Sequence, residues 1–211
     1  MKAVIHGLYA VTPEGVEDSD LLARVARALE GGARVVQYRN KIGGHKVRTR
    51  QARILQSLCL SHGVPLIVND HVEIATTVGA AGVHLGEADG SIAAARARLG
   101  SQAIVGASCY NDIERAHRAV ASGADYIAFG SFFASANKPH AVRASADMLR
   151  EARRVLAVPI VAIGGITANN APALIAAGAD AIAVISDLFD APDVRQAAER
   201  LSRLFAAAES P

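Results

Sequence analysis

The chain has 211 residues, of which 51% are hydrophobic and 20% are charged. This is enough apolar material for a large buried core, so the composition excludes a disordered chain. The formal net charge is only +2, and the basic residues are scattered over expected helix surfaces. The charge pattern therefore argues against a protein that binds nucleic acid, and any bound anion must be held by a few placed cations.

The two cysteines, Cys59 and Cys109, form no CxxC pair, so the sequence indicates neither a disulfide framework nor a zinc site. We expect both to be buried as small apolar residues. Met1 leads into an expected strand instead of a basic segment and an apolar region, so we expect no signal peptide. No apolar run approaches the roughly 18 residues that cross a bilayer. These features predict a cytoplasmic protein that binds no membrane.

Short apolar runs rich in β-branched residues alternate along the chain with longer stretches in which apolar residues recur at helical spacing. The runs typical of buried strands are Gly7–Val11, Val35–Arg39, Pro65–Asn69, Gly82–Leu85, Ala103–Ala107, Asp125–Gly130, Pro159–Gly164 and Asp180–Ile185. The clearest helical stretches are Leu21–Leu29, Arg48–Leu60, Ile113–Val120 and Val194–Leu204. Strands that are apolar throughout and alternate with helices indicate a parallel sheet covered by helices.

Eight such units predict a (β/α)8 TIM barrel, with an open doubly wound sheet as the alternative. We expect residues 1–211 to form a single domain, because the sequence contains no linker, low-complexity tract or break in composition. Active sites of such barrels lie at the carboxyl ends of the strands. Polar residues that close a strand are therefore the candidates for function.

The second expected strand ends in a polar run, in which Gln37, Arg39 and Lys41 alternate and are expected to point to the barrel mouth. An arginine binds two phosphate oxygens with its planar fork, while a lysine supplies a compact charge. This pattern predicts an anion clamp. A solvated basic rim is the alternative.

Carboxylates follow the next two expected strands. Asp70 comes directly after Asn69 at the end of the third, and Asp89 lies shortly after the fourth. Magnesium takes one or two protein carboxylates and completes its octahedron with substrate phosphates and water, so the pair predicts a Mg2+ site. The alternative is that both aspartates cap the helices that follow.

Further phosphate-binding features follow the later strands. The loop after the sixth strand offers Ser135, Asn137 and Lys138, a weak signal by itself. Gly165 follows the seventh strand and Ser186 the eighth, where barrels often bind a phosphate. One phosphate site with a metal and one without it imply two phosphorylated substrates.

Covalent catalysis is not favoured by the sequence. The histidines show no metal-ligand spacing, and we expect His84, inside the fourth strand, to be a core or supporting residue. Ser108 has no evident base partner in the sequence and lies in no GxSxG motif.

Taken in order, these residues resemble the thiamine-phosphate synthase family. The segments that carry the resemblance are VQYRNK (36–41), LIVND (66–70), GVHLGEADG (82–90), IVGASC (104–109), DYIAFGSFF with NKP (125–139), VAIGGI (161–166) and AVIS (183–186). Each segment is modestly specific, whereas the ordered set is highly specific and covers most of the chain.

The resemblance implies a transferase that couples 4-amino-2-methyl-5-hydroxymethylpyrimidine diphosphate to 4-methyl-5-hydroxyethylthiazole phosphate, releasing diphosphate and giving thiamine phosphate. In the implied dissociative chemistry, diphosphate leaves before the thiazole nitrogen attacks, so no general base is needed. A Mg2+ cofactor and a homodimer are also implied.

Carried over by position, the resemblance assigns roles to residues of this chain. Those implied to contact the pyrimidine diphosphate are Gln37, Arg39, Lys41, Asn69 and Lys138, with Ser108 near the pyrimidine. Tyr38 and Asn40, in the same run as the clamp, are also expected to bind substrate. Those implied to hold the thiazole phosphate are Ser135, Asn137, Gly165, Ile185 and Ser186. Asp70 and Asp89 would ligate Mg2+, and the residues implied to act in catalysis are Arg39, Lys41, Lys138 and Ser108.

The sequence departs from the family pattern at three places. The loop 134–138 reads Ala-Ser-Ala-Asn-Lys where the family usually has Pro-Thr-x-Thr-Lys. Glu87 replaces a usual glutamine, and its charge would repel a phosphate unless it faces away. His71 stands where a second acidic residue is common. None of these changes removes a metal ligand or a clamp cation.

Three other functions fit parts of the pattern. A related thiazole tautomerase has the barrel and one phosphate site but needs no diphosphate clamp or carboxylate pair. A non-catalytic sensor of a phosphorylated ligand is also compatible with the fold, as is another phosphate-binding barrel enzyme such as a sugar-phosphate isomerase.

Overall fold

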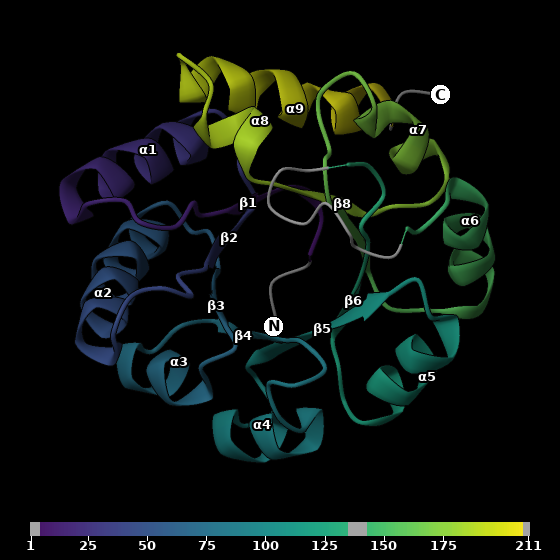
Figure 1. Cartoon of the computed structure of the whole chain (residues 1–211), viewed down its shortest axis with the longest axis horizontal. Helices are drawn as coiled ribbons and strands as arrows, with labels where there is room; N and C mark the ends of the chain where they lie inside the picture. Colours follow the sequence, from purple (N-terminus) through teal and green to yellow (C-terminus); the bar gives the residue numbers. More distant parts are fainter. Residues whose placement is uncertain (1–4, 135–142, 209–211) are drawn as a thin grey trace.

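Parallel strands close into a barrel in the computed structural model, which describes residues 5–134 and 143–208. The order of the strands around the barrel is their order along the chain, and β8 pairs with β1. Figure 1 looks down this barrel and shows the helices as a ring around it. The predicted (β/α)8 fold is confirmed, and the pairing of β8 with β1 excludes the open sheet.

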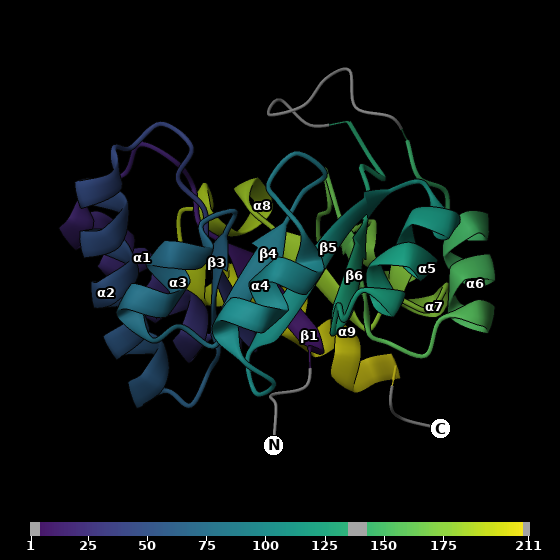
Figure 2. The same ribbon diagram turned by 90° about the horizontal axis from the view of Figure 1, so that it is seen from below.

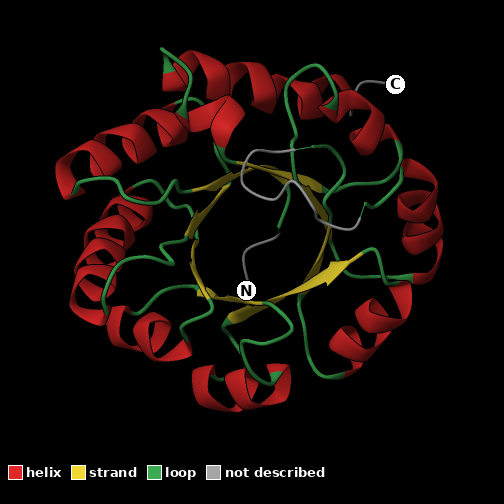
Figure 3. Ribbon diagram, viewed as in Figure 1, coloured by secondary structure: helices red, strands yellow, loops and turns green. Residues whose placement is uncertain are grey.

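The elements alternate as predicted. The strands are β1 (Gly7–Val11), β2 (Val35–Tyr38), β3 (Leu66–Asn69), β4 (Gly82–Leu85), β5 (Ile104–Tyr110), β6 (Tyr126–Phe129), β7 (Ile160–Ile163) and β8 (Ala181–Val184). The helices are α1 (Asp18–Glu30), α2 (His45–Ser61), α3 (Val72–Val78), α4 (Ile92–Leu99), α5 (Ile113–Ala121), α6 (Ala146–Val155), α7 (Ala171–Ala176), α8 (Ser186–Phe189) and α9 (Val194–Ala208). Figure 3 separates the inner ring of strands from the outer ring of helices.

Two strand ends differ from the sequence prediction in a way that matters for the site. β2 stops at Tyr38, because the backbone N–H of Arg39 donates to the Thr12 hydroxyl at 2.9 Å instead of continuing the sheet. β5 continues past the predicted Ala107 to Tyr110, with an irregular register against β6 at its end. The longer β5 places Ser108 on a strand and therefore in a fixed direction.

Side chains alternate between two apolar layers along each strand. In β1, Leu8 and Ala10 pack outward against the helices, while Tyr9 and Val11 point into the barrel. The inner layer contains Ile5, Tyr9, Val11, Val35, Ile67, Ile104, Tyr126, Ala128, Val161, Ala181 and Ala183. The large outer layer joins strands to helices, and both cysteines are buried in it without a disulfide, as predicted.

The inward positions become polar toward the carboxyl ends of the strands. In β2, Val35 is followed two residues later by Gln37, and in β3 Ile67 is followed by Asn69. The alternation therefore fills one end of the barrel with apolar side chains and leaves polar ones at the other. In Figure 2, which views the barrel from the side, α8 lies at the upper end of the barrel, directly after β8.

Two similar arginine–aspartate clamps tie helices to strand starts at the opposite, amino-terminal end. Asp180, just before β8, accepts a hydrogen bond from the N–H of Ile160 in β7 at 2.7 Å and from Arg153 of α6 at 2.8 Å. Asp125, just before β6, similarly pairs with Arg96 of α4 and accepts from a backbone N–H of β5 at 2.8 Å. Both aspartates end a Gly-Ala-Asp sequence, so the same sequence makes the same arginine–aspartate contact twice.

Within residues 5–134 and 143–208, no helix is long and apolar enough to cross a membrane.

Candidate active site

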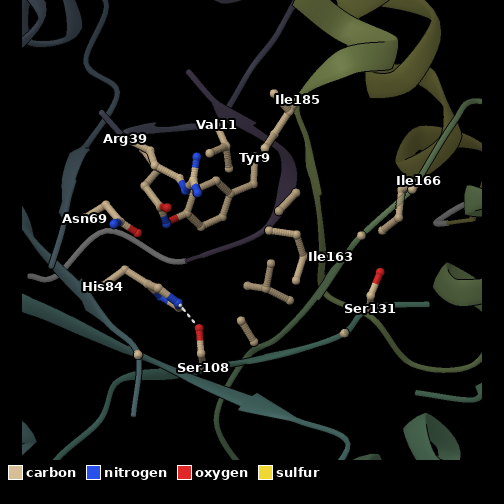
Figure 4. A pocket seen from close by; sticks show the side chains of 18 of the residues that line it. Tyr9, Val11, Arg39, Asn69, His84, Ser108, Ser131, Ile163, Ile166 and Ile185 are labelled. Carbon is tan, nitrogen blue, oxygen red and sulfur yellow. Dashed lines mark hydrogen bonds between the residues drawn. The ribbon is translucent and has the colours of Figure 1, made fainter. Parts of the chain in front are cut away.

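A cavity of about 980 Å³ lies at the carboxyl ends of the strands, where the sequence predicted the site. Each of the eight strands contributes at least one residue to its wall, and the loops after the strands supply the rest. Figure 4 shows part of the wall, with Arg39, Asn69 and Ser108 directed into the space. The predicted site residues that line it are Gln37, Arg39, Lys41, Asn69, Asp70, Asp89, Ser108, Gly165, Ile185 and Ser186. Ser135, Asn137 and Lys138 lie outside the described residues.

The predicted clamp residues come together on one side of the cavity. Arg39 forms an ion pair with Glu14 from the β1–α1 loop, and the same carboxylate accepts from the backbone N–H of Lys41 at 3.2 Å. The Lys41 ammonium lies 3.2 Å from Asp70. Glu14 was missed by the sequence interpretation, although it follows β1 closely and the rule of polar residues after strands applies to it. Its carboxylate contacts two of the three clamp residues, Arg39 through the side chain and Lys41 through the backbone.

Tyr38 and Asn40 are not part of the cavity wall. The Tyr38 hydroxyl donates to the side-chain oxygen of Gln51 on α2 at 2.8 Å, and the Asn40 amide donates to the same oxygen at 3.0 Å. The alternation of β2 explains this, since every second side chain in the run 37–41 faces the helices. The side chains of Tyr38 and Asn40 therefore face α2 and not the cavity.

The two candidate metal ligands cap no helix. The residue before α3 is His71, with no capping side chain, and the residue before α4 is Ser91, whose hydroxyl accepts from a helix N–H. Asp89 instead folds back, and its carboxylate accepts from the N–H of Gly86 at 2.9 Å. Asp70 sits in the left-handed region with φ 63°, a conformation that aspartate tolerates better than most residues. The capping interpretation is wrong for both.

The Asp70 carboxylate lies in an unfavourable environment for a negative charge. Burial raises its pKa above the ordinary value, and the neighbouring Asp89 carboxylate raises it further, while the charge of Lys41 opposes the shift. Asp70 is 15% exposed and Lys41 is 52% exposed, so the lysine only partly compensates. An added positive charge beside the two carboxylates would therefore offset this unfavourable environment.

Two departures from the family pattern point away from the cavity. The Glu87 side chain is 69% exposed and pairs with Arg115 of α5 at 2.7 Å. His71 lies beside Glu73, with its Nδ1 3.3 Å from the carboxylate. Neither residue belongs to the cavity wall, so the charge of Glu87 does not face a ligand there.

The opposite side of the cavity is built from glycine loops. Gly164 and Gly165 have positive φ angles of 103° and 65°. A Cβ atom on Gly164 would overlap Ser131, and one on Gly165 would lie 2.5 Å from the backbone oxygen of Ala134. The loop after β7 therefore packs directly on the loop after β6 because both positions are glycine. Asn170 fixes the turn by donating to the Gly165 oxygen at 3.0 Å.

Ser108 has a histidine partner, contrary to the sequence expectation. Its hydroxyl lies 2.8 Å from Nε2 of His84, the contact drawn as a dashed line in Figure 4. His84 is 6% exposed, and burial lowers its pKa to about 4, so the ring is neutral. The pair was missed because the residues are 24 positions apart, on β4 and β5. The burial of His84 agrees with the prediction of a core residue.

Tyr9 and Tyr126 complete the floor, and no sequence signal pointed to them. Both lie within strands that are apolar throughout, yet their hydroxyls meet inside the barrel at 2.8 Å. Their interaction depends on β1 and β6 facing each other across the closed barrel.

A closed (β/α)8 barrel whose mouth combines placed cations, a carboxylate pair and glycine loops defines a protein suited to binding small anionic ligands. The chain belongs to the thiamine monophosphate synthase family, whose model matches residues 8–188. It is similar to the thiamine-phosphate synthase of Chromobacterium violaceum, with 55% identity over 96% of this chain and 98% of that protein. It is also similar to the thiamine-phosphate synthase of Thiobacillus denitrificans, with 54% identity over 98% of this chain and 98% of that protein.

A solved structure supports the same assignment. The thiamine phosphate pyrophosphorylase from Pyrococcus furiosus superimposes with a TM-score of 0.86 at 33% identity, covering 97% of both chains. The predicted family is confirmed, and the chain is an enzyme of this transferase family.

Proposed function

We propose that this enzyme joins 4-amino-2-methyl-5-hydroxymethylpyrimidine diphosphate to 4-methyl-5-hydroxyethylthiazole phosphate, with Mg2+, and releases thiamine phosphate and diphosphate. The observation that carries the proposal is one cavity with two different sides. Arg39, Lys41 and the carboxylate pair line one side, and Gly165 and Ser186 line the other. The names of the relatives support the same reaction.

The clamp side suits the diphosphate. Glu14 contacts the Arg39 guanidinium through one terminal nitrogen, and arginine has five N–H donors, so further donors remain for phosphate oxygens. The half-exposed Lys41 side chain adds a compact positive charge. Lys138 is proposed as a third cation and lies outside the described residues.

The residues beside the clamp fit one Mg2+. Asp70 and Asp89 offer oxygen atoms only, and magnesium takes one or two carboxylates from a protein when phosphates complete its coordination. The described residues contain no group of three or more histidine, cysteine or carboxylate side chains that form an all-protein metal cage. The raised pKa of Asp70 is consistent with this, since an added cation offsets both burial and the repulsion from Asp89. A bound Mg2+ would neutralise charge on the departing diphosphate.

The proposed reaction is dissociative. The bond between the pyrimidine methylene carbon and the diphosphate oxygen breaks, and its electron pair leaves with the diphosphate. Arg39 and Lys41 stabilise the negative charge that develops there. The lone pair of the thiazole nitrogen then forms the new carbon–nitrogen bond, so no side chain acts as a covalent nucleophile. The protein contributes charge stabilisation and the alignment of two bound partners.

The glycine side suits the thiazole phosphate. Gly164 and Gly165 carry no side chain, so phosphate oxygens reach the backbone N–H groups of this loop. Ile185 and Ser186, directly after β8, lie across the same part of the cavity wall. Ser135 and Asn137 are proposed as further contacts and lie outside the described residues.

The direct test is an assay with purified protein and both substrates, in Mg2+ or in EDTA, that follows thiamine phosphate and diphosphate. Metal-dependent formation of both products is the expected result. Absence of product, with the thiazole phosphate still bound, would contradict the proposal and leave the tautomerase or the sensor. Light scattering of the same sample tests the proposed homodimer, and fractionation of the source cells tests the proposed cytoplasmic location.

A further inference from the structure

Five polar side chains form a continuous chain of hydrogen bonds across the floor of the cavity. Ser108 Oγ lies 2.8 Å from His84 Nε2, and His84 Nδ1 lies 2.9 Å from the Tyr126 hydroxyl. The Tyr126 and Tyr9 hydroxyls are 2.8 Å apart, and Gln37 Nε2 donates to Tyr9 at 2.8 Å. The chain therefore connects two predicted substrate contacts, Gln37 and Ser108, through three residues with no assigned role.

Four of the five members are buried, and Ser108 at the end of the chain is partly exposed. Tyr126 is fully buried, Tyr9 is 1% exposed, and Gln37 and His84 are 5% and 6% exposed. The Tyr126 ring stacks on the His84 ring, with centroids 5.5 Å apart. Gly106 makes room for the Tyr126 ring, because a Cβ atom there would overlap it. Buried polar groups of this kind must each satisfy their hydrogen bonds within the chain.

One arrangement of the hydrogens satisfies every link in a single direction, from Gln37 to Ser108. The amide nitrogen of Gln37 donates to the Tyr9 oxygen, and in this arrangement the Tyr9 hydrogen goes to Tyr126. Tyr126 then donates to His84 Nδ1, which carries no hydrogen. A histidine ring whose Nδ1 accepts has its one ring hydrogen on Nε2. Nε2 donates to Ser108, whose hydroxyl hydrogen is left for the cavity.

We propose that Tyr9, Tyr126 and His84 are positioning residues that make Ser108 a hydrogen-bond donor to the pyrimidine ring. This inference rests on the proposed function for the identity of the ring. The direction is opposite to that of a serine nucleophile, in which histidine accepts the serine hydrogen. The close Ser108–His84 pair therefore serves recognition of the ring, in keeping with a reaction that needs no covalent intermediate.

The test compares two variants that each lose one buried tyrosine hydroxyl. Tyr126→Phe keeps the ring but interrupts the chain, and His84 loses the donor that fixes its tautomer. Tyr38→Phe is the matched control, because its hydroxyl is also buried but bonds Gln51 outside the cavity. We expect KM for the pyrimidine diphosphate to rise about tenfold in Tyr126→Phe, with KM for the thiazole phosphate unchanged. Tyr38→Phe should change neither value by more than about twofold.

A spectroscopic measurement is independent of activity. Nitrogen-15 NMR of the histidine rings, with His84 assigned by comparison with His84→Asn, should show Nε2 protonated and Nδ1 unprotonated in the natural protein. Tyr126→Phe should give a mixture of both tautomers. Tyr9→Phe, which removes only the earlier link, provides a second interruption should Tyr126→Phe fold poorly, and melting curves identify that case.

The outcomes separate the two proposals. A natural protein with Nδ1 protonated overturns the proposed direction, because Ser108 then donates to histidine. Equal KM values in Tyr126→Phe and Tyr38→Phe overturn the positioning role. An inactive natural protein contradicts the proposed function, whereas the tautomer measurement still decides the direction of the chain.

Discussion

Replacing Asp180 by alanine should destabilise the barrel without changing its chemistry. The carboxylate accepts from the N–H of Ile160 at 2.7 Å, and Ile160 is fully buried. Leaving that N–H without its partner costs about 1–3 kcal/mol. The ion pair with Arg153 adds only about 0–1 kcal/mol, because both side chains are about one third exposed. We therefore expect a loss of about 2 kcal/mol and a fall in Tm of about 4–8 °C.

Urea unfolding and calorimetry measure this loss, and steady-state kinetics measure the site. Asp180→Asn keeps an acceptor oxygen and should lose about half as much stability. Asp125→Ala breaks the equivalent clamp, which uses different partners, so the two losses should add within about 0.5 kcal/mol. Because both arginine–aspartate pairs lie at the end of the barrel away from the cavity, kcat/KM should stay unchanged. A loss below about 0.5 kcal/mol for Asp180→Ala would refute the reasoning.

Three further predictions concern the site. In melting experiments, Mg2+ with diphosphate at 100 times Kd should stabilise the natural protein by about 2.7 kcal/mol, and Asp70→Asn should remove this stabilisation. If the stabilisation persists in Asp70→Asn, Asp70 is not a ligand. Gly165→Ala should raise KM for the thiazole phosphate about tenfold and leave that for the pyrimidine diphosphate unchanged, since the added methyl meets the Ala134 oxygen; equal effects on both would argue against a local role. Burial holds the pKa of His84 at about 4, below its unfolded value near 6.5. The contribution of the neutral ring to the free energy of unfolding is therefore complete above about pH 6.5 and decreases as the pH falls toward 4. Titrated unfolding of His84→Gln should show a shallower loss over this window, and an identical slope would contradict the assignment.

Local sequence was enough to determine the barrel and much of its mouth. Continuous apolar runs that alternate with helices leave few folds other than a helix-covered parallel sheet, because such strands must be buried on both faces. Period-two alternation also explains why Gln37 and Arg39 face the cavity while Tyr38 faces α2. The sequence interpretation extended substrate contact to every residue of the run, whereas the side chains of Tyr38 and Asn40 bond Gln51 of α2.

Closure of the barrel decided the rest. Tyr9 and Tyr126 are 117 positions apart, and nothing in either apolar strand indicates that their hydroxyls meet. The Ser108–His84 pair depends on the register of β4 against β5, and the contact of Glu14 with Arg39 depends on how the loop after β1 folds. A residue's own strand fixes the direction in which its side chain points. Its partner is fixed only when the strands close into a ring, because hydrogen bonds across the barrel join residues that no local pattern relates.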